Sequence, residues 1–434
     1  MVTEQLYELF LQHPVINTDT RKIAKGSLFF ALKGDKFDAN SFAQQALEAG
    51  AAYAIIDNAQ YRLGEQYILV DDVLTGLQNL ARYHRKQLQI PVIGLTGTNG
   101  KTTTKELIKA VLSQHFNTYA TQGNLNNHIG VPLSILSVTK DHEMAVIEMG
   151  ANHQKEIELL STISQPTHGL ITNVGKAHLE GFGGPEGVKI AKGELYDYLQ
   201  ASNGIIFINT DSPVLAEMKA ARGLQNTIGY GTQESGNLIT GKVTKNAPYV
   251  SLAWKGEDGI THEVDSHLTG AYNLDNMLAA ICIGTYFKMT DAEINAGISS
   301  YQPTNNRSQI TQTASNTLIC DYYNANPSSM AVAIDNISTM DARDKVLVLG
   351  DMFELGDDSA AEHEAIIQKA IAAPVNQRIF IGKAFYDLKQ GFSADFYETT
   401  DDAVKALKEK PVKHSTVLIK GSRGMALERL VELF

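Results

Sequence analysis

Cysteine and long apolar runs are what this sequence most clearly lacks. Its 434 residues include two cysteines, Cys282 and Cys320. They are too few for a disulfide framework or a cysteine zinc site, so a reducing compartment is expected. No apolar run approaches the roughly 18 residues of a membrane-spanning helix. The first ten residues carry acidic side chains where a secretion signal would carry basic ones. We therefore expect a cytoplasmic protein that is neither secreted nor membrane-bound.

Positive charge is also in short supply. With 37 basic and 48 acidic residues, the formal net charge is −11, which makes the chain a poor general binder of nucleic acid or of an anionic membrane. Because 434 residues exceed what one compact core supports and 43% of them are apolar, we expect two or three well-filled domains.

The most informative stretch is PVIGLTGTNGKTTT, residues 91–104. Its apolar start predicts a buried strand, and the sequence that follows has the apolar periodicity of a helix. Gly97 and Gly100 allow the backbone to approach an anion, Lys101 supplies a positive charge, and Thr102 offers a hydroxyl to magnesium at the helix N-terminus. Together they predict a triphosphate-binding loop. The general P-loop pattern has glycine at the position of Leu95, so an ordinary glycine-rich turn is the alternative.

Two further strands of the same type end in residues that could bind a cation. Residues 144–147 are apolar and are followed by Glu148, and the strand expected at 170–174 leads into a loop with His178. Carboxyl ends of parallel strands face the crevice where such sheets bind ligands. Glu148 is therefore a magnesium candidate, with a solvated strand end or a helix cap as the alternative. For His178 the alternative is a structural histidine.

Two asparagine-rich segments are typical of ligand contacts. Residues 121–132, TQGNLNNHIGVP, cannot form a regular helix or strand and would present amides and hydroxyls, unless they form a surface loop held by Asx turns. Asn273 and Asn276 lie one turn apart at the start of an expected helix. Asparagine is unfavourable inside helices, which indicates capping or ligand binding there.

Several of these motifs resemble the Mur ligases. The loop GTNGKT is similar to that of the Mur ligases and of folylpolyglutamate synthetase. The segment 121–132 and the segment DYYNANP, residues 321–327, resemble the branch of the Mur ligases that adds a terminal dipeptide. The DNPR motif of the relatives that add diaminopimelate or lysine is absent. The resemblance extends over nearly all of the chain.

The resemblance and the alternation of apolar strands with helices predict an α/β fold of three domains. Residues 1–88 would form a small UDP-sugar-binding α/β domain, and residues 84–90 a polar connection out of it. Residues 89–303 would form a central ATP-binding domain of the P-loop ATPase type with a mostly parallel sheet. Residues 304–434 would form a Rossmann-like domain that binds D-alanyl-D-alanine.

The resemblance also implies the site residues. Lys101, His178 and Lys192 would be catalytic, and Lys192, fourteen residues after His178, would be carbamylated, with Lys189 as the alternative. Arg307 would reach the ATP phosphates from a hinge, where the family usually has glycine and this chain has Asn306, a residue that tolerates positive φ. The ATP-binding residues would be Gly97, Thr98, Asn99, Gly100, Lys101, Thr102, Thr103, Asn273, Asn276 and Arg307. The metal ligands would be Thr102, Glu148, His178 and Lys192. The substrate contacts would be Arg21, Ser27, Lys33, Asn40, Thr121, Asn124, Asn127, Asp321, Tyr323, Asn324, Asn326, Ser422 and Arg423.

The function implied is ATP-dependent amide ligation. The enzyme would join D-alanyl-D-alanine to UDP-N-acetylmuramoyl-tripeptide through an acyl phosphate, with ATP and two Mg²⁺ ions, as a monomer without nucleic-acid or membrane partners. The alternatives are an amino-acid-adding Mur ligase, folylpolyglutamate synthetase and a P-loop phosphotransferase. Folylpolyglutamate synthetase lacks a separate N-terminal nucleotide-sugar domain like the one expected here.

Overall fold

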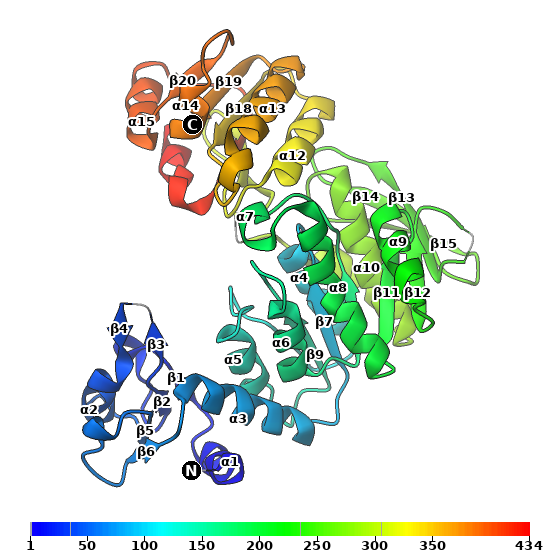
Figure 1. Ribbon diagram of the computed structural model, residues 1–434. Helices are drawn as coiled ribbons and strands as arrows, with labels where there is room; N and C mark the ends of the chain where they lie inside the picture. Colours follow the sequence, from blue (N-terminus) through cyan, green and yellow to red (C-terminus); the bar gives the residue numbers. More distant parts are fainter. Residues whose placement is uncertain (1, 35, 235, 305) are drawn as a thin grey trace.

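Three large β-sheets follow one another along the chain, and each is built from one stretch of sequence (Figure 1). The computed structural model describes residues 2–34, 36–234, 236–304 and 306–434. The three-domain α/β class expected from the sequence is confirmed. The residues at which the domains meet stay a prediction. Within the described ranges, no helix is long and apolar enough to cross a lipid bilayer.

The first sheet has four parallel strands in the order β1-β2-β5-β6. Its apolar strands are buried between short helices, and a small hairpin, β3-β4, lies outside it. The elements are α1 (Thr3–Gln12), β1 (Ile16–Asn17), η1 (Thr20–Lys22), β2 (Leu28–Phe30), β3 (Lys33–Gly34), β4 (Phe37–Asp38), η2 (Ala39–Phe42), α2 (Ala43–Glu48), β5 (Tyr53–Ile56), η3 (Ala59–Tyr61), β6 (Tyr67–Leu69) and α3 (Val73–Gln87).

The central sheet has nine strands in the order β15-β14-β13-β12-β11-β10-β7-β9-β8. Strand β7, which carries the glycine-rich loop, is buried at every position and pairs in parallel with β10 and β9. Its strands are β7 (Val92–Thr96), β8 (Thr118–Ala120), β9 (Met144–Glu148), β10 (His168–Ile171), β11 (Ile205–Asn209), β12 (Thr227–Gly231), β13 (Ile239–Lys245), β14 (Ser251–Lys255) and β15 (Thr261–Asp265). The last three pair antiparallel with one another and extend the sheet at one edge.

Helices cover both faces of this sheet, and apolar clusters fill the space on each side. They are α4 (Lys101–Leu112), α5 (Gly130–Leu136), α6 (Glu156–Ser164), α7 (Leu179–Phe182), α8 (Pro185–Ala201), α9 (Pro213–Arg222), η4 (Ala271–Asn273), α10 (Leu274–Tyr286) and α11 (Asp291–Ser300). The chain runs from β7 outward in both directions across the sheet. This arrangement opens a crevice at the carboxyl ends of β7, β9 and β10.

The third sheet has the order β16-β17-β21-β18-β19-β20, parallel except for β16. Its elements are β16 (Gln309–Gln312), β17 (Thr317–Asp321), α12 (Pro327–Thr339), β18 (Lys345–Gly350), η5 (Gly356–Asp358), α13 (Ser359–Ala372), β19 (Gln377–Ile381), α14 (Lys383–Asp387), β20 (Asp395–Tyr397), α15 (Thr400–Glu409), β21 (Thr416–Lys420), η6 (Arg423–Met425) and η7 (Leu427–Leu433). The alternation of strands and helices expected from the sequence is present in this domain.

The expected polar connection at residues 84–90 was wrong, because residues 84–87 are the last turn of α3. His84 and Arg85 are buried. Nε2 of His84 lies 2.7 Å from the Val138 carbonyl oxygen, and Arg85 donates to the carbonyls of Ser164 and Leu88 at 3.0 and 2.7 Å. A guanidinium can be buried where carbonyls satisfy its donors. Helix α3 thereby packs on α5 and α6 and joins the first two domains.

The partly buried His168 should make stability depend on pH. His168 opens β10 against Phe207 and Phe287, with ring centroids 6.1 and 5.1 Å away, and burial lowers its pKa from 6.5 to about 4. Between these values the unfolded chain binds the proton and the folded chain does not. The free energy of unfolding therefore falls as pH drops through this window. In His168→Phe, which keeps an aromatic ring, denaturant titrations should show a smaller fall. An unchanged fall would contradict this assignment.

Candidate active site

A cavity of about 870 Å³ lies where the carboxyl ends of the central strands face the third domain. Three loops far apart in the sequence meet there because carboxyl ends of neighbouring parallel strands lie at one edge of a sheet. Most of the predicted site is brought together around it. The predicted residues that line it are Thr98, Asn99, Gly100, Lys101, Thr103, Asn124, Asn127, Glu148, His178, Asn273, Asn276, Arg307, Asp321, Tyr323, Asn324 and Asn326.

The glycine-rich loop requires its glycines. Gly97 has φ +147°, and a Cβ there would lie 2.0 Å from Oγ1 of Thr172. Gly100 has φ +78°, and a Cβ there would lie 2.7 Å from Oδ1 of Asn276. Gly100 also stands at the N-cap of α4, and no side chain caps this end of the helix. The N–H groups of the first turn can therefore bind a phosphate.

Lys101 folds back onto the loop that carries it. Its Nζ donates to the carbonyl oxygens of Gly97 and Thr98 at 2.7 and 3.0 Å. Its pKa is lowered to about 8, mainly by burial and to a smaller extent by the nearby Arg307, while Glu148 opposes the shift. Phosphate oxygens could replace the two carbonyls and stabilise the charged form, so these residues fit a triphosphate.

Glu148 lies at the end of β9 and is almost fully buried. Its carboxylate accepts hydrogen bonds from Oγ1 of Thr102 and from Nδ2 of Asn126, both at 2.9 Å. Its backbone N–H donates to Oγ1 of Thr121 at 3.0 Å. A carboxylate, a hydroxyl and an amide oxygen are hard donors that fit Mg²⁺. Asn126 was not singled out from the sequence, although it belongs to the asparagine-rich segment that was.

His178 lines the cavity and Lys192 does not, but both side chains lie near the ring of Phe182. His178 has φ +50° and its Nδ1 contacts the carboxylate of Glu354 from the third domain. Lys192 is buried in α8, with Nζ 5.0 Å from the centroid of the Phe182 ring. Burial, with a smaller contribution from Lys101, lowers the pKa of Lys192 to about 7. A lysine that is largely neutral near neutral pH can react with carbon dioxide.

Arg307 reaches the cavity from the connection into the third domain. The preceding Asn306 has φ +57°, which confirms that asparagine provides the turn expected of glycine. The Arg307 guanidinium stacks 4.1 Å from the centroid of Tyr323, and that of Arg423 lies 5.4 Å from the same ring. Nε of Arg307 is buried without a hydrogen-bond partner among the described residues, so it remains available to an anion.

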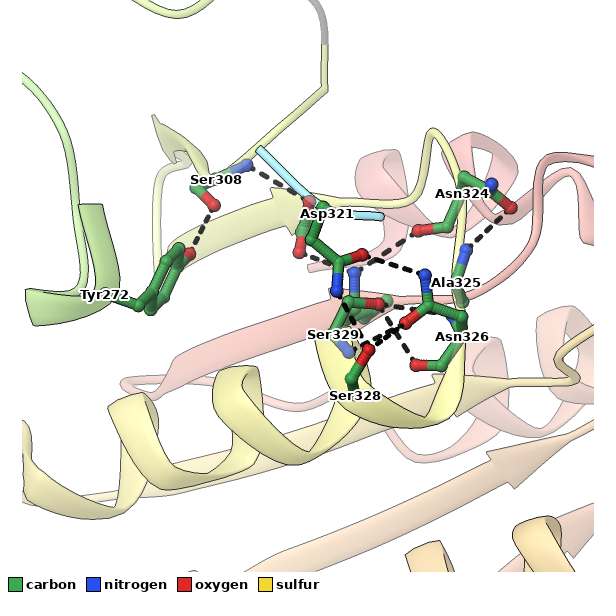
Figure 2. Close-up of polar contacts among 10 residues, drawn as sticks. Tyr272, Ser308, Asp321, Asn324, Ala325, Asn326, Ser328 and Ser329 are labelled. Atoms are coloured by element: carbon green, nitrogen blue, oxygen red, sulfur yellow. Dashed lines mark hydrogen bonds and ion pairs between the residues drawn. The ribbon is translucent and has the colours of Figure 1, made fainter. Parts of the chain in front are cut away.

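Figure 2 shows a series of polar contacts between the central and third domains. Tyr272 contacts Ser308 at 2.5 Å, and the Ser308 N–H donates to Asp321 at 3.3 Å. The Asp321 carboxylate also pairs with the buried Lys420 at 2.7 Å. Lys420 was not predicted, although its segment, residues 419–425, was expected at a strand end near the site and supplied Ser422 and Arg423 to the prediction.

Helix α12 holds the glycine-rich loop directly. Asn326 caps α12 through the Ser329 N–H and donates from Nδ2 to Oδ1 of Asn99 at 2.8 Å. Nδ2 of Asn99 donates to Oγ of Ser328 at 2.9 Å. Since the Asn99 side chain is bound by the third domain, the position of that domain is coupled to the position of the loop.

The two asparagines of α10 lie beside the loop helix. Nδ2 of Asn276 donates to Oδ1 of Asn273, and Oγ1 of Thr104 donates to Oδ1 of Asn276, both at 2.9 Å. Asn273 donates to the carbonyl of Thr269 at 2.8 Å. Their contact with ATP stays a prediction.

Some predicted residues do not line the cavity. Thr121 supports Glu148 and accepts from Lys105 through its carbonyl. Ser422 is buried and accepts from the Phe353 N–H at 3.1 Å. Four others, Arg21, Ser27, Lys33 and Asn40, lie in the N-terminal domain. There Asn40 bonds within its own domain to Asp38 and Asp57, and Lys33 pairs with Asp57.

The loop and the cavity define a P-loop type of phosphate-binding site in a three-domain α/β protein. Three family descriptions match successive parts of the chain: the Mur ligase family catalytic domain at residues 14–92, the Mur ligase middle domain at 95–284, and the Mur ligase glutamate ligase domain at 306–423. The chain belongs to the Mur ligase family.

Similar proteins match along nearly their whole length. The UDP-N-acetylmuramoyl-tripeptide–D-alanyl-D-alanine ligase of Bacillus subtilis is 37% identical over 98% of this chain and 94% of the relative. The ligase of the same name from Escherichia coli is 36% identical over 96% and 92%. Among solved structures, MurF from Acinetobacter baumannii has a TM-score of 0.88 at 30% identity, covering 99% and 98% of the two chains. MurF ligase from Thermotoga maritima in complex with ADP has a TM-score of 0.85 at 26% identity, covering 98% and 97%.

The geometry predicts that Lys101→Ala abolishes turnover and leaves the fold nearly intact. The lysine is the cation of the loop, so its loss should reduce kcat by roughly a thousandfold or more. Stability should change little, because its hydrogen bonds go to carbonyls of its own loop. Phosphate-release assays and thermal unfolding measure the two effects. Lys109→Ala, on the outer part of the same helix, is the control, and a Lys101→Ala variant that still turns over would remove the loop from the mechanism.

Proposed function

We propose that this protein is an ATP-dependent amide ligase that joins D-alanyl-D-alanine to UDP-N-acetylmuramoyl-tripeptide. Near full-length similarity to ligases with that name supports the substrates. The observation that carries the chemistry is a single cavity that contains the partly buried Lys101, the buried Glu148 and an arginine, Arg307, with an available donor. That combination suits the transfer of a phosphoryl group to another anion.

The reaction requires activation of a carboxylate. A carboxylate does not acylate an amine in water, so one of its oxygens first accepts the γ-phosphoryl group of ATP and becomes part of a leaving group. The amine of the dipeptide then attacks the acyl carbon, the bond to the phosphate oxygen breaks, and an amide and inorganic phosphate result. Because water would hydrolyse the acyl phosphate, the cavity between the domains has to exclude it.

The residues of the chain position and neutralise the reacting anions. Lys101 would leave its loop carbonyls for the terminal phosphates, and Arg307 would bind them from the hinge side through its available Nε. Thr102 and Glu148 would hold one Mg²⁺, and His178 with a carbamylated Lys192 a second. Bound there, Mg²⁺ would offset the repulsion between phosphoryl group and carboxylate. These roles are proposals that rest on the donor sets described above.

Each domain would bind a different part of the substrates. We assign Asn124 and Asn127 to the peptidyl substrate because they line the cavity beside Glu148. The third domain would hold the dipeptide near Asp321, Tyr323 and Asn324. The N-terminal domain would hold the UDP end of the substrate. There Ser27 has a buried Oγ without a hydrogen-bond partner among the described residues, and Lys33 is half-exposed.

We further propose that one chain acts alone and in the cytoplasm. Lys101, Glu148, His178 and Arg307 of one chain already meet at one cavity, and ATP is the co-substrate. The two cysteines are buried and unbonded to each other, which suits a reducing compartment.

The carbamate on Lys192 can be tested directly. Addition of carbon dioxide to the neutral amine forms a nitrogen–carbon bond and releases a proton, and a pKa of about 7 leaves much of the amine neutral near pH 7. Carbon-13 NMR in labelled bicarbonate should show a carbamate resonance. Lys189→Ala should retain it, because Lys189 pairs with Glu217 at 2.5 Å and its pKa is raised. Lys192→Ala should lack it, and a resonance that persists there would contradict the assignment.

The function is tested by leaving out one component at a time. Phosphate release should require ATP, Mg²⁺, UDP-N-acetylmuramoyl-tripeptide and D-alanyl-D-alanine together, and mass spectrometry should detect the pentapeptide product. Release at the same rate without either peptide would indicate a phosphotransferase or an ATPase. Release with a single amino acid in place of the dipeptide would indicate another amide ligase of the superfamily.

A further inference from the structure

The loop after β18 brings a carboxylate of the third domain into the cavity. Glu354 lines the cavity and contacts Nδ1 of His178 in the central domain. Both residues have left-handed backbones, with φ +63° at Glu354 and +50° at His178. Non-glycine residues adopt this conformation at a cost, and such residues concentrate at functional sites. The two strained positions meet each other across the boundary between the domains.

The loop that carries Glu354 is fixed at its base. The buried Asp351 accepts hydrogen bonds from the N–H groups of Ala384 and Phe385 at 3.0 and 3.1 Å. The Met352 N–H donates to Nε2 of the buried His363 at 3.0 Å. The Phe353 N–H donates to Ser422, as described above. Three successive residues before Glu354 are therefore anchored to the third domain, and the Glu354 side chain is held toward the cavity.

The charges around the cavity distinguish Glu354 from its neighbours. The third domain lines the cavity with two carboxylates, Asp321 and Glu354. Asp321 is compensated within its own domain by Lys420 at 2.7 Å. Among the described residues, the ion-pair contact of Glu354 is with His178 of the other domain, and its side chain remains 56% exposed. Glu354 thus offers an anionic, accessible acceptor in the cavity where Lys101 would hold the terminal phosphates and His178 a cation.

We propose that Glu354 binds the amine end of the incoming dipeptide. A free dipeptide carries an ammonium group, which a carboxylate near the acyl carbon can bind and hold in place. The nitrogen attacks the acyl carbon as the neutral amine, after the ammonium group has released its proton to water. This inference rests on the proposed function and adds a residue to it. When the dipeptide is bound, its ammonium group would then contact the Glu354 carboxylate in place of Nδ1 of His178.

The alternative is that Glu354 only holds the two domains together, and a second ion pair between the same domains provides a control for it. Lys176 and Glu362 form another contact between the same two domains, at 2.5 Å, and neither lines the cavity. If Glu354 only holds the domains together, removing its charge should have the same effect as removing that of Glu362. If it binds the amine, the two variants should differ in the KM for the dipeptide.

The experiment compares Glu354→Gln with Glu362→Gln. Loss of a charge-assisted hydrogen bond should raise the KM for D-alanyl-D-alanine by roughly tenfold or more in Glu354→Gln. The KM values for ATP and the tripeptide, and the thermal unfolding temperature, should stay close to those of the unsubstituted protein. Glu362→Gln should leave all of them nearly unchanged. Propionyl-D-alanine, which has the shape of the dipeptide without its amine, should inhibit the unsubstituted protein and Glu354→Gln equally.

Other outcomes would overturn the inference. An unchanged KM for the dipeptide, an equal rise in both variants, or weaker inhibition by propionyl-D-alanine in Glu354→Gln would exclude amine binding. A change confined to the Mg²⁺ dependence would place Glu354 in the cation site instead. Failure of the proposed function is distinguishable, because the unsubstituted protein would then release phosphate without requiring the dipeptide.

Discussion

The crowding of several cations in and beside one cavity is the constraint on which the rest of the site depends. Lys101 is partly buried and Lys192 is buried, and each has a pKa well below that of a free lysine. Arg307 lowers the pKa of Lys101, and Lys101 in turn lowers that of Lys192, so the cations repel one another. Glu148 offsets only part of this. Such an arrangement is costly without a ligand and becomes favourable when a polyphosphate and a carboxylate enter together.

The third domain completes this site by contacts with the loop rather than by a separate surface. Asn326 and Ser328 bind the side chain of Asn99, and the Asp321–Ser308–Tyr272 contacts join the hinge to the central domain. Movement of the third domain would therefore disturb the loop and Arg307 at the same time. Because the third domain holds the loop and Arg307 in place, the site is complete only when the domains are closed around the substrates. This coupling would make the reaction depend on all three substrates.

The sequence predicted those features that are local. The strand, glycine turn and helix around Lys101, the position of Glu148 at a strand end and the positive φ of Asn306 all follow from residue type and spacing. Features that depend on contacts between distant segments were missed. Residues 84–87 looked polar because the carbonyls that satisfy Arg85 are supplied by residues far away in the sequence. Glu354 and Lys420 were not singled out, although their segments, residues 349–356 and 419–425, were expected at strand ends where a site would form. Which residue of each segment matters is defined by His178 and Asp321 across the fold.

The central step of the proposed reaction is the transfer of a phosphoryl group to the peptide carboxylate. If the tripeptide carboxylate is labelled with oxygen-18, cleavage of the acyl phosphate should leave one labelled oxygen in each inorganic phosphate released, as measured by mass spectrometry. Unlabelled phosphate, formed while the amide product still accumulates, would show that the carboxylate was activated in some other way and would contradict the mechanism.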